Sequence, residues 1–299
     1  MRIVDKSKKI PALDQLGIEG KNAKILEKAI SLPNGIILTS EPTGSGKSTT
    51  LYACLARLNT PEINIMTLED PVENTIDGIN QSQVFPTIGY TFANGLRTAL
   101  RQDPDIIMVG EVRDAETINI AIEASLTGHL VLSTIHTNSA AETITRVLNM
   151  GIQAFLLPAA INAVIAQRLI RRLCDCKKPI SANDLDDRTK QSVRRAIGRT
   201  DKVELASRVS KESLESPVFY EPVGCDKCGN SGYKGRLGIY EILEITPKIK
   251  QLIIAGASGT AINEAAIDDG MISLEQDGII KALNGLTSLT EVYAAAKEE

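Results

Sequence analysis

The sequence contains no tryptophan, and aromatic residues make up only 3% of its 299 residues. Proteins that bind single-stranded nucleic acid use aromatic side chains as stacking platforms, and this composition argues against that class. A strongly basic surface is lacking too, because the formal net charge is −4 and the pI is about 5.5. We therefore expect no nucleic-acid partner.

We also expect no secretion signal. Residues 1–10 read MRIVDKSKKI, which is charged throughout and has no apolar segment of the kind a signal peptide requires. The longest apolar run, residues 151–167, is interrupted by Gln153, Pro158 and Asn162 and is short for a membrane span, which needs about 20 residues. We expect that run to form a buried helix and the protein to be cytoplasmic. Its five cysteines are then reduced thiols or metal ligands rather than disulfides.

What the sequence does contain is a regular alternation of apolar strands and helices in its first half. Four short apolar runs predict strands at 35–39, 63–68, 105–109 and 130–134, and helix spacing follows at 47–58, 115–126 and 140–148. A further helix is predicted at 16–29. Near-continuous apolar strands that alternate with helices are typical of a parallel α/β sheet covered on both faces.

The second half of the chain has a different composition and pattern. Residues 177–216 are polar and rich in charge, and a pair of cysteines stands on each side of this stretch. The remainder predicts helices at 248–255, 260–268 and 274–283. We divide the chain into an amino-terminal segment, an α/β core, a cysteine module and a helical carboxyl-terminal subdomain, at residues 1–20, 21–172, 173–240 and 241–299.

The segment Thr39–Thr50, TSEPTGSGKSTT, joins a predicted strand to a predicted helix and follows the phosphate-loop pattern G-x-x-x-x-G-K-[ST]. In such a loop Lys47 reaches the β- and γ-phosphates, and the Ser48 hydroxyl binds Mg²⁺. Backbone N–H groups and the helix amino terminus hold the phosphates. The alternative is a glycine–serine turn that happens to contain a lysine. The predicted nucleotide-binding residues are Pro42, Thr43, Gly44, Ser45, Gly46, Lys47, Ser48 and Thr49.

Glu41 occupies the position of the first glycine in that pattern. A carboxylate about 4 Å from a phosphate charge would oppose binding by about 4 kcal/mol at an effective dielectric of 20. At the end of a strand, with its side chain in solvent, screening reduces this penalty to about 1 kcal/mol or less. We therefore predict ATP binding that is weakened but retained.

Acidic residues follow two of the predicted strands. Glu111 ends the third strand, beside the strand of the phosphate loop as we predict it, where it would orient an attacking water. The turn LEDPVE, residues 68–73, follows the second strand and places Glu69 nearest to the strand end. It predicts a second acidic arm near Mg²⁺ and the γ-phosphate, and the alternative is a solvated acidic loop.

The only two histidines, His129 and His136, lie at opposite ends of the fourth strand. His136, at its carboxyl end, is a candidate to contact the γ-phosphate, although a structural role is an equal alternative for a single histidine. Arginines flank the third strand and would neutralise phosphate charge, as arginine fingers do. The candidates are Arg97, Arg101 and Arg113, and the sequence does not distinguish among them or from ordinary surface arginines.

Four cysteines form two close pairs, Cys174 with Cys176 and Cys225 with Cys228. Four thiolates describe a structural zinc site, although the first pair is one residue shorter than the usual C-x-x-C. Four reduced cysteines without a metal are the alternative. The fifth, Cys54, is expected to be a small buried residue.

The order of these motifs resembles the traffic ATPases of type IV pilus assembly and type II secretion. The likeness rests on the phosphate loop and four further segments: LEDPVE, ALRQDPDIIMVGEVRD, GHLVLSTIHTNSA and GCDKCGNSGYKGRLGIYEIL. It implies a RecA-like P-loop core, ATP with Mg²⁺, and structural zinc on the four cysteines. It further implies catalytic roles for Lys47 and Glu111, with Glu69 in the acidic box and His136 in the histidine box.

The same resemblance implies partners. Proteins of this family act as cytoplasmic hexamers and reach the inner membrane through a platform protein rather than by spanning it. The cysteine module favours assembly or secretion over pilus retraction, and residues 2–7 resemble the last strand of a preceding domain, so that residues 1–20 are read as its remnant. We therefore predict a motor ATPase. The alternatives are a nucleotide-binding scaffold without turnover and, with less support, a small-molecule phosphotransferase.

Overall fold

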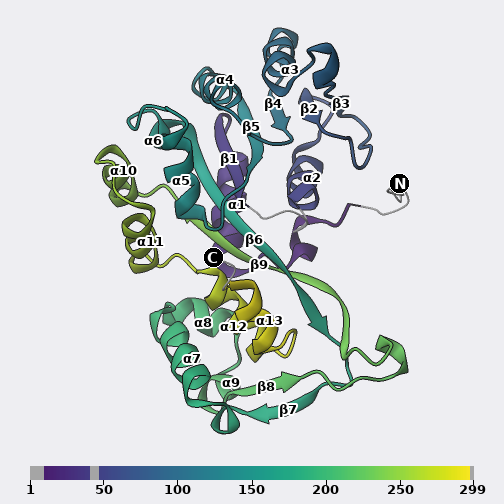
Figure 1. Cartoon of the computed structure of the whole chain (residues 1–299), viewed down its shortest axis with the longest axis vertical. Coiled ribbons are helices and arrows are strands. Elements are labelled where there is room, and N and C mark those ends of the chain that lie inside the picture. The colour runs from purple at the N-terminus through teal and green to yellow at the C-terminus, as the bar shows by residue number, and fades with distance from the viewer. Residues whose placement is uncertain (1–9, 41–46, 297–299) are drawn as a thin grey trace.

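The computed structural model describes residues 10–40 and 47–296, with the side chains of Lys47 and Ser48 excepted (Figure 1). A seven-stranded sheet has the order β3-β2-β4-β5-β1-β6-β9. All neighbouring strands pair in parallel except β9, which is antiparallel to β6. The strands are β1 (Gly35–Ser40), β2 (Ile65–Glu69), β3 (Asn80–Gln83), β4 (Ile106–Val109), β5 (Leu130–Ile135), β6 (Ile161–Leu173) and β9 (Tyr233–Glu244).

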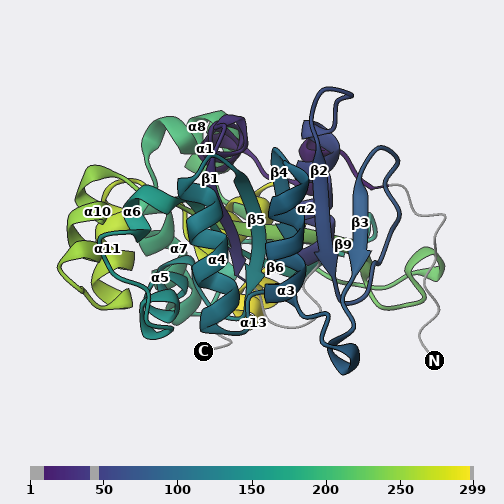
Figure 2. The ribbon, with the colours of Figure 1, turned by 90° about the horizontal axis from the view of Figure 1, so that it is seen from above.

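Helices cover both faces of this sheet, as the apolar strands predict. Alternate residues of β1 belong to different cores: Ile36 and Leu38 belong to the core that also contains residues of α3 (Phe92–Ala99), α4 (Ala115–Leu126) and α5 (Ala140–Asn149). Ile37 packs instead with α1 (Gly20–Ser31) and α2 (Lys47–Leu58). Figure 2 shows α4 lying along β1 and β5. The predicted α/β class with a mostly parallel sheet is confirmed.

The predicted helices are found close to their expected bounds. Helices α2 and α4 begin and end at the predicted residues, and α5 is one residue longer than predicted. Asp114 caps α4 by accepting a hydrogen bond from the backbone N–H of Thr117 at 2.8 Å, which explains why that helix begins at Ala115. Helix α1 begins later than predicted, because a short 3-10 turn at Leu13–Leu16 precedes it.

The prediction of a buried helix at residues 151–167 is wrong. Only Leu157–Ala160 form a short helix, α6, and the chain then enters the 13-residue strand β6. This strand lies between β1 and β9, so most of its side chains are buried on both faces. A strand buried on both faces has no period-2 alternation, and periodicity alone cannot separate it from a buried helix.

Strands β6 and β9 extend beyond the main sheet into a second region, in the lower part of Figure 1. It contains a two-stranded antiparallel sheet of β7 (Lys178–Ser181) and β8 (Val218–Glu221), with helices α7 (Asp187–Arg199), α8 (Lys202–Arg208) and α9 (Lys211–Glu215). The polar composition of residues 177–216 had suggested little strand, and these short elements were not predicted individually.

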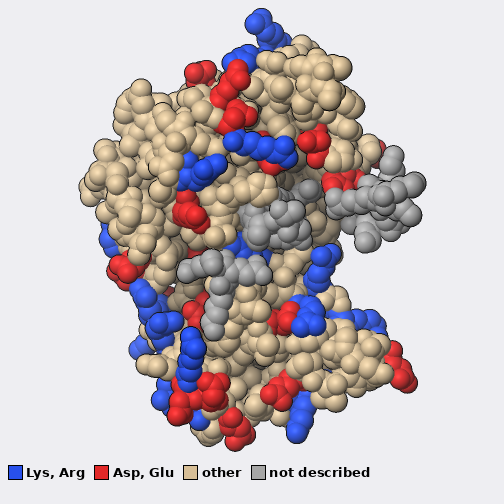
Figure 3. Space-filling model, in the orientation of Figure 1, with Lys and Arg blue, Asp and Glu red and all other residues tan. Residues whose placement is uncertain are grey.

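The predicted carboxyl-terminal helices are present. They are α10 (Pro247–Ile254), α11 (Gly259–Asp268), α12 (Leu274–Leu283) and α13 (Leu289–Ala296), of which only α13 was not predicted. Helix α12 packs on β9 and α13 packs on β6. Within the described residues, no helix is long and apolar enough to cross a membrane. Acidic and basic side chains are intermixed on the face shown in Figure 3.

Candidate functional site

A cavity of about 350 Å³ lies at the carboxyl ends of β2, β4 and β5. It gathers side chains from three motifs that are far apart in the sequence: the acidic turn after β2, the segment after β4, and the residue after β5. Its polar and charged lining residues are Glu69, Asp70, Glu73, Glu111, Arg113, Thr134 and His136. Ligands of parallel α/β sheets bind at this edge, so the cavity is the natural candidate for chemistry.

Glu111 lies between two cationic or potentially cationic groups. It forms an ion pair with Arg113, and its other oxygen lies 3.1 Å from Nε2 of His136. Partial burial raises the pKa of Glu111, but Arg113 and His136 outweigh it, and the net pKa is below the ordinary value. The carboxyl group is therefore ionised at neutral pH and can accept a hydrogen bond from a water molecule.

One predicted neighbour relation is wrong. Strand β4, which carries Glu111, does not lie beside β1, because β5 is inserted between them. It is His136, at the end of β5, that follows a strand paired directly with the phosphate-loop strand. The error arises because helical crossovers let strands enter the sheet out of sequence order.

Glu69 lies in the wall of the cavity rather than in a solvated loop. Its side chain accepts hydrogen bonds from the Tyr52 hydroxyl, the Thr67 hydroxyl and Nε2 of Gln81, the last at 3.0 Å, and the residue is 4% exposed. Burial, with Glu69 beside it, raises the pKa of Tyr52. By contrast, Asp70 in the same turn is exposed.

The structure separates the three candidate arginines. Arg113 lines the cavity and contacts Glu111. Arg97 forms an ion pair with Glu116 at 2.8 Å, and together with Arg101 it lines a different hollow between α3 and α4. Within this chain, only Arg113 of the three reaches the described lining of the cavity. Catalytic roles for Arg97 and Arg101 stay predictions.

Of the two histidines, only His136 lies at the cavity. His136 faces Glu111, whereas His129, at the opposite end of β5, places Nδ1 3.0 Å from the carbonyl oxygen of Ala124. These positions match the expectation that the two do not share one site.

Most of the phosphate loop lies outside the described residues. The predicted loop residues outside them are Glu41, Pro42, Thr43, Gly44, Ser45 and Gly46, with the side chains of Lys47 and Ser48. The flanking elements are described: β1 ends at Ser40, α2 begins at Lys47, and Thr49 is exposed on the first turn. The buried Thr50 hydroxyl donates to Oε1 of Gln167 on β6 at 2.5 Å.

Sequence reasoning missed the residues that hold Glu69. Tyr52 lies on the buried face of α2, where an aromatic residue is indistinguishable from ordinary core. Gln81 lies on β3, whose sequence NQSQ has no apolar character and gives no strand signal.

The four paired cysteines are brought together where the antiparallel pair of β6 and β9 ends. Leu173 pairs with Tyr233 across the two strands, so that the segments beside them meet. The four sulfur atoms all lie within 4.8 Å of one another. Neighbouring sulfurs are 3.9 Å apart for Cys174 and Cys225, 3.9 Å for Cys176 and Cys228, and 3.7 Å for Cys225 and Cys228.

These distances suit a tetrahedral metal. Zinc–sulfur bonds of about 2.3 Å place tetrahedral sulfurs about 3.8 Å apart. Desolvation raises the pKa of Cys228, but backbone N–H groups of Cys225 and Gly232 and nearby thiols outweigh it and lower the pKa to about 6. The short C-x-C spacing therefore does not keep the first pair from the cluster, and the donor set fits zinc. Cys54, as expected, is fully buried.

A mostly parallel sheet, acids that converge at its carboxyl edge and a phosphate-loop sequence between β1 and α2 are typical of proteins that bind nucleotides. The profile of the family described as "Type II/IV secretion system protein" matches residues 1–294. The chain belongs to this family.

Individual relatives divide between two transport systems. The chain is 46% identical over 299 residues to the type IV pilus assembly ATPase PilB of Thermus thermophilus, covering all of this chain and 32% of that protein. It is also 46% identical over 300 residues to the type II secretion system protein E of Dickeya dadantii, covering all of this chain and 56% of that protein. The chain thus spans about a third of the length of the first relative and somewhat over half of the length of the second.

The fold agrees with a solved structure of a related motor. The crystal structure of the pilus retraction motor PilT with bound ADP matches with a TM-score of 0.68 and 26% identity, over 98% of this chain and 69% of that one. The fold class predicted from the sequence is confirmed by this match.

Proposed function

We propose that this chain hydrolyses ATP to ADP and phosphate as the motor part of a type IV pilus assembly or type II secretion system. The observation that carries the proposal is the meeting of Glu111, His136, Arg113 and Glu69 in one cavity at the edge where β1 leads into the phosphate-loop sequence. Family membership and the names of the relatives support it.

Each residue has a role that its surroundings suit. Glu111 is ionised and accepts a hydrogen bond from the attacking water, which aligns the water with the γ-phosphate. His136 holds the other carboxylate oxygen of Glu111 and lies where it can contact the phosphate. Arg113 offsets negative charge as it develops. Lys47 would bind the β- and γ-phosphates, and Ser48 would hold Mg²⁺, which would neutralise phosphate charge.

The cysteine cluster serves a structural purpose in this proposal. Four thiolates would hold zinc with no open coordination position, which is the arrangement of structural rather than catalytic sites. The ion would join the segment between β6 and β7 to the segment between β8 and β9.

The remaining proposals concern assembly. We propose that the protein acts as a homo-hexamer on the cytoplasmic face of the inner membrane and contacts the membrane through a platform protein. The support for this assembly is the family and the relatives' membership in pilus and secretion systems. The divisions at residues 20, 172 and 240 stay predictions.

Mg²⁺-dependent phosphate release tests the proposed activity. We compare the wild type with Lys47→Ala and Glu111→Gln, and use Glu62→Gln as a matched control because Glu62 is exposed before β2, at the other edge of the sheet. We expect both site variants to lose turnover by about 100-fold or more and the control to keep it. Equal release from all four proteins would exclude the motor function and leave a nucleotide-binding scaffold.

A further inference from the structure

Two consecutive residues of β6 form hydrogen bonds on opposite faces of the sheet, near its carboxyl edge. Gln167 faces α2 and accepts the hydrogen bond of Thr50. Arg168 faces the other side of the sheet, where its Nη2 donates to the carbonyl oxygen of Asn138 at 2.6 Å and its Nη1 donates to the carbonyl oxygen of Gln167 at 2.9 Å. Both residues are buried, at 2% and 4% exposure.

Asn138 belongs to the histidine turn, residues 136–139, which joins β5 to α5. The neighbouring strand β9 holds the other side of this turn. Oε1 of Glu241 accepts a hydrogen bond at 3.0 Å from the backbone N–H of Ala140, the first residue of α5. Glu241 is 4% exposed. The backbone N–H of Leu274, the first residue of α12, also acts to lower the pKa of Glu241.

A buried charge is tolerated only where it is paired and hydrogen-bonded. Burial raises the pKa of Glu241, and the backbone N–H groups of Ala140 and Leu274 and the charge of Arg168 only reduce that rise. The two buried side chains are held at this position by their hydrogen bonds to the Asn138 carbonyl oxygen and to the amino terminus of α5. The turn lies at the surface, and its backbone groups could be hydrated without buried charged partners. The use of two buried charged side chains therefore indicates that the turn must be held in one position.

The position of the turn matters because it begins with His136. Nε2 of His136 lies 3.1 Å from Oε2 of Glu111. The Ser40 hydroxyl, at the end of β1, donates to the carbonyl oxygen of Thr137 at 2.8 Å. The turn is thus held from β1, β6 and β9 at once, and only its first residue reaches the lining of the cavity.

We propose that Arg168 and Glu241 are positioning residues for ATP hydrolysis, which fix the histidine turn so that His136 meets Glu111. Neither lines the cavity, so they act through the turn rather than on the nucleotide. The proposal rests on the function proposed above for the reaction, but the geometry it predicts is measurable without turnover.

The first test is spectroscopic and needs no activity. The chain has two histidines, so its Cε1–H spectrum contains two imidazole signals, which His129→Asn assigns. In wild type, Glu111→Gln should shift the His136 signal. In Arg168→Gln and in Glu241→Ala that response to Glu111→Gln should be lost. Arg172→Gln, an exposed residue on the same strand, is the control and should retain it.

The second test separates positioning from stability. We expect Arg168→Gln to lower kcat about 10- to 100-fold, as displacement of a reacting group by about 1 Å does, with the KM for ATP changed less than twofold. Combined with His136→Ala, its effect should be largely absent, because both changes remove the same contact. Arg168→Lys, which retains the buried charge but cannot make both bonds, is the variant to use if Arg168→Gln does not fold.

A His136 signal that still responds to Glu111→Gln in folded Arg168 and Glu241 variants would overturn the proposal. The proposal would also be overturned if the decrease in kcat of the double variant equalled the product of the decreases in Arg168→Gln and His136→Ala. Failure of the wild type to release phosphate would count against the proposed function alone, since the spectroscopic test would still decide the positioning role.

Discussion

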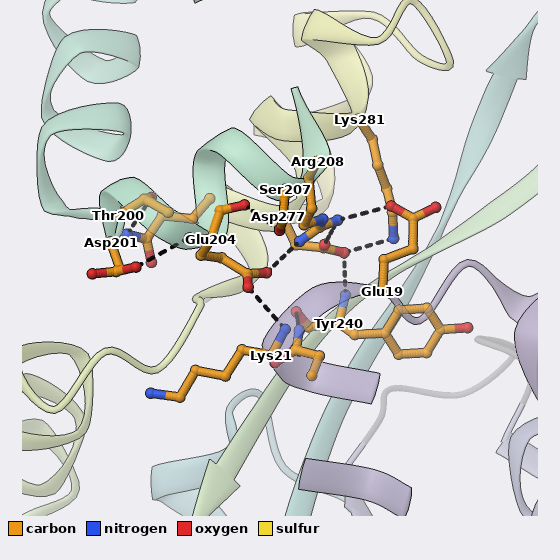
Figure 4. A network of polar contacts seen from close by, with 12 residues as sticks. Glu19, Lys21, Thr200, Asp201, Glu204, Ser207, Arg208, Tyr240, Asp277 and Lys281 are labelled. Carbon is orange, nitrogen blue, oxygen red and sulfur yellow. Dashed lines mark hydrogen bonds and ion pairs between the residues drawn. The ribbon is translucent and has the colours of Figure 1, made fainter. Parts of the chain in front are cut away.

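A buried ionic cluster joins the cysteine-containing region to the rest of the molecule, and its removal gives the sharpest stability prediction. Asp277 on α12 lies at its centre (Figure 4). Its Oδ1 contacts Nη2 of Arg208 at 2.6 Å, and its Oδ2 contacts Nζ of Lys281 at 2.7 Å. Oδ2 also accepts from the backbone N–H of Tyr240 at 2.9 Å.

We predict that Asp277→Asn lowers the free energy of unfolding by about 3 to 5 kcal/mol, the usual cost of breaking a buried ion pair by removing one partner. The side chains of Asp277, Arg208 and Lys281 are at most 2% exposed. Losing two charge-assisted hydrogen bonds of about 1.5 to 3 kcal/mol each leads to the same range. Asparagine keeps the volume and an acceptor for Tyr240, so the change isolates the charge.

Urea unfolding followed by circular dichroism measures the effect, with Asp268→Asn as the control. Asp268 forms a pair with Arg199 at 3.5 Å in which both side chains are about half exposed or more, so its loss should cost less than about 0.5 kcal/mol. A loss below about 1 kcal/mol for Asp277→Asn would refute the reasoning. So would equal losses in the two variants.

Three other predictions concern the site and the cysteines. Because Arg113 helps to lower the pKa of Glu111, Arg113→Leu should raise that pKa and move the acidic limb of the pH–rate profile to higher pH; an unmoved limb would contradict the assignment. Elemental analysis of protein purified without chelator should find one zinc per chain, unchanged in Cys54→Ser, and a content near zero would exclude the zinc site. Glu41→Gly should tighten ATP binding about fivefold, the equivalent of about 1 kcal/mol, and unchanged affinity by titration calorimetry would remove the predicted penalty.

The fold was predictable wherever local signals were strong. The bounds of α2 and α4 follow from apolar periodicity and, for α2, from the phosphate-loop sequence. Where a segment is buried on both faces, as β6 is, apolar content no longer reports the period, and the prediction of a helix at residues 151–167 was wrong. Strand β3 gave no signal at all, since its sequence NQSQ is polar.

In the candidate site, too, some features were predictable from the sequence and others were not. The residue types were readable in the chain, because strand-end acids, a strand-end histidine and paired cysteines carry recognisable chemistry. Their partners were not. That β5 separates β4 from β1, that Arg113 rather than Arg97 faces Glu111, and that Tyr52 and Gln81 hold Glu69 are consequences of strand order and packing.

By itself, therefore, the sequence determined the family, the α/β class and the chemical groups available, since these depend on local patterns and on the order of motifs. Only the tertiary structure decided which groups meet. The four cysteines meet because β6 and β9 pair in antiparallel register, and the histidine turn is held by Arg168 and Glu241 from those same two strands. Contacts between residues separated by dozens to over a hundred positions are set by the topology of the sheet, which no local pattern encodes.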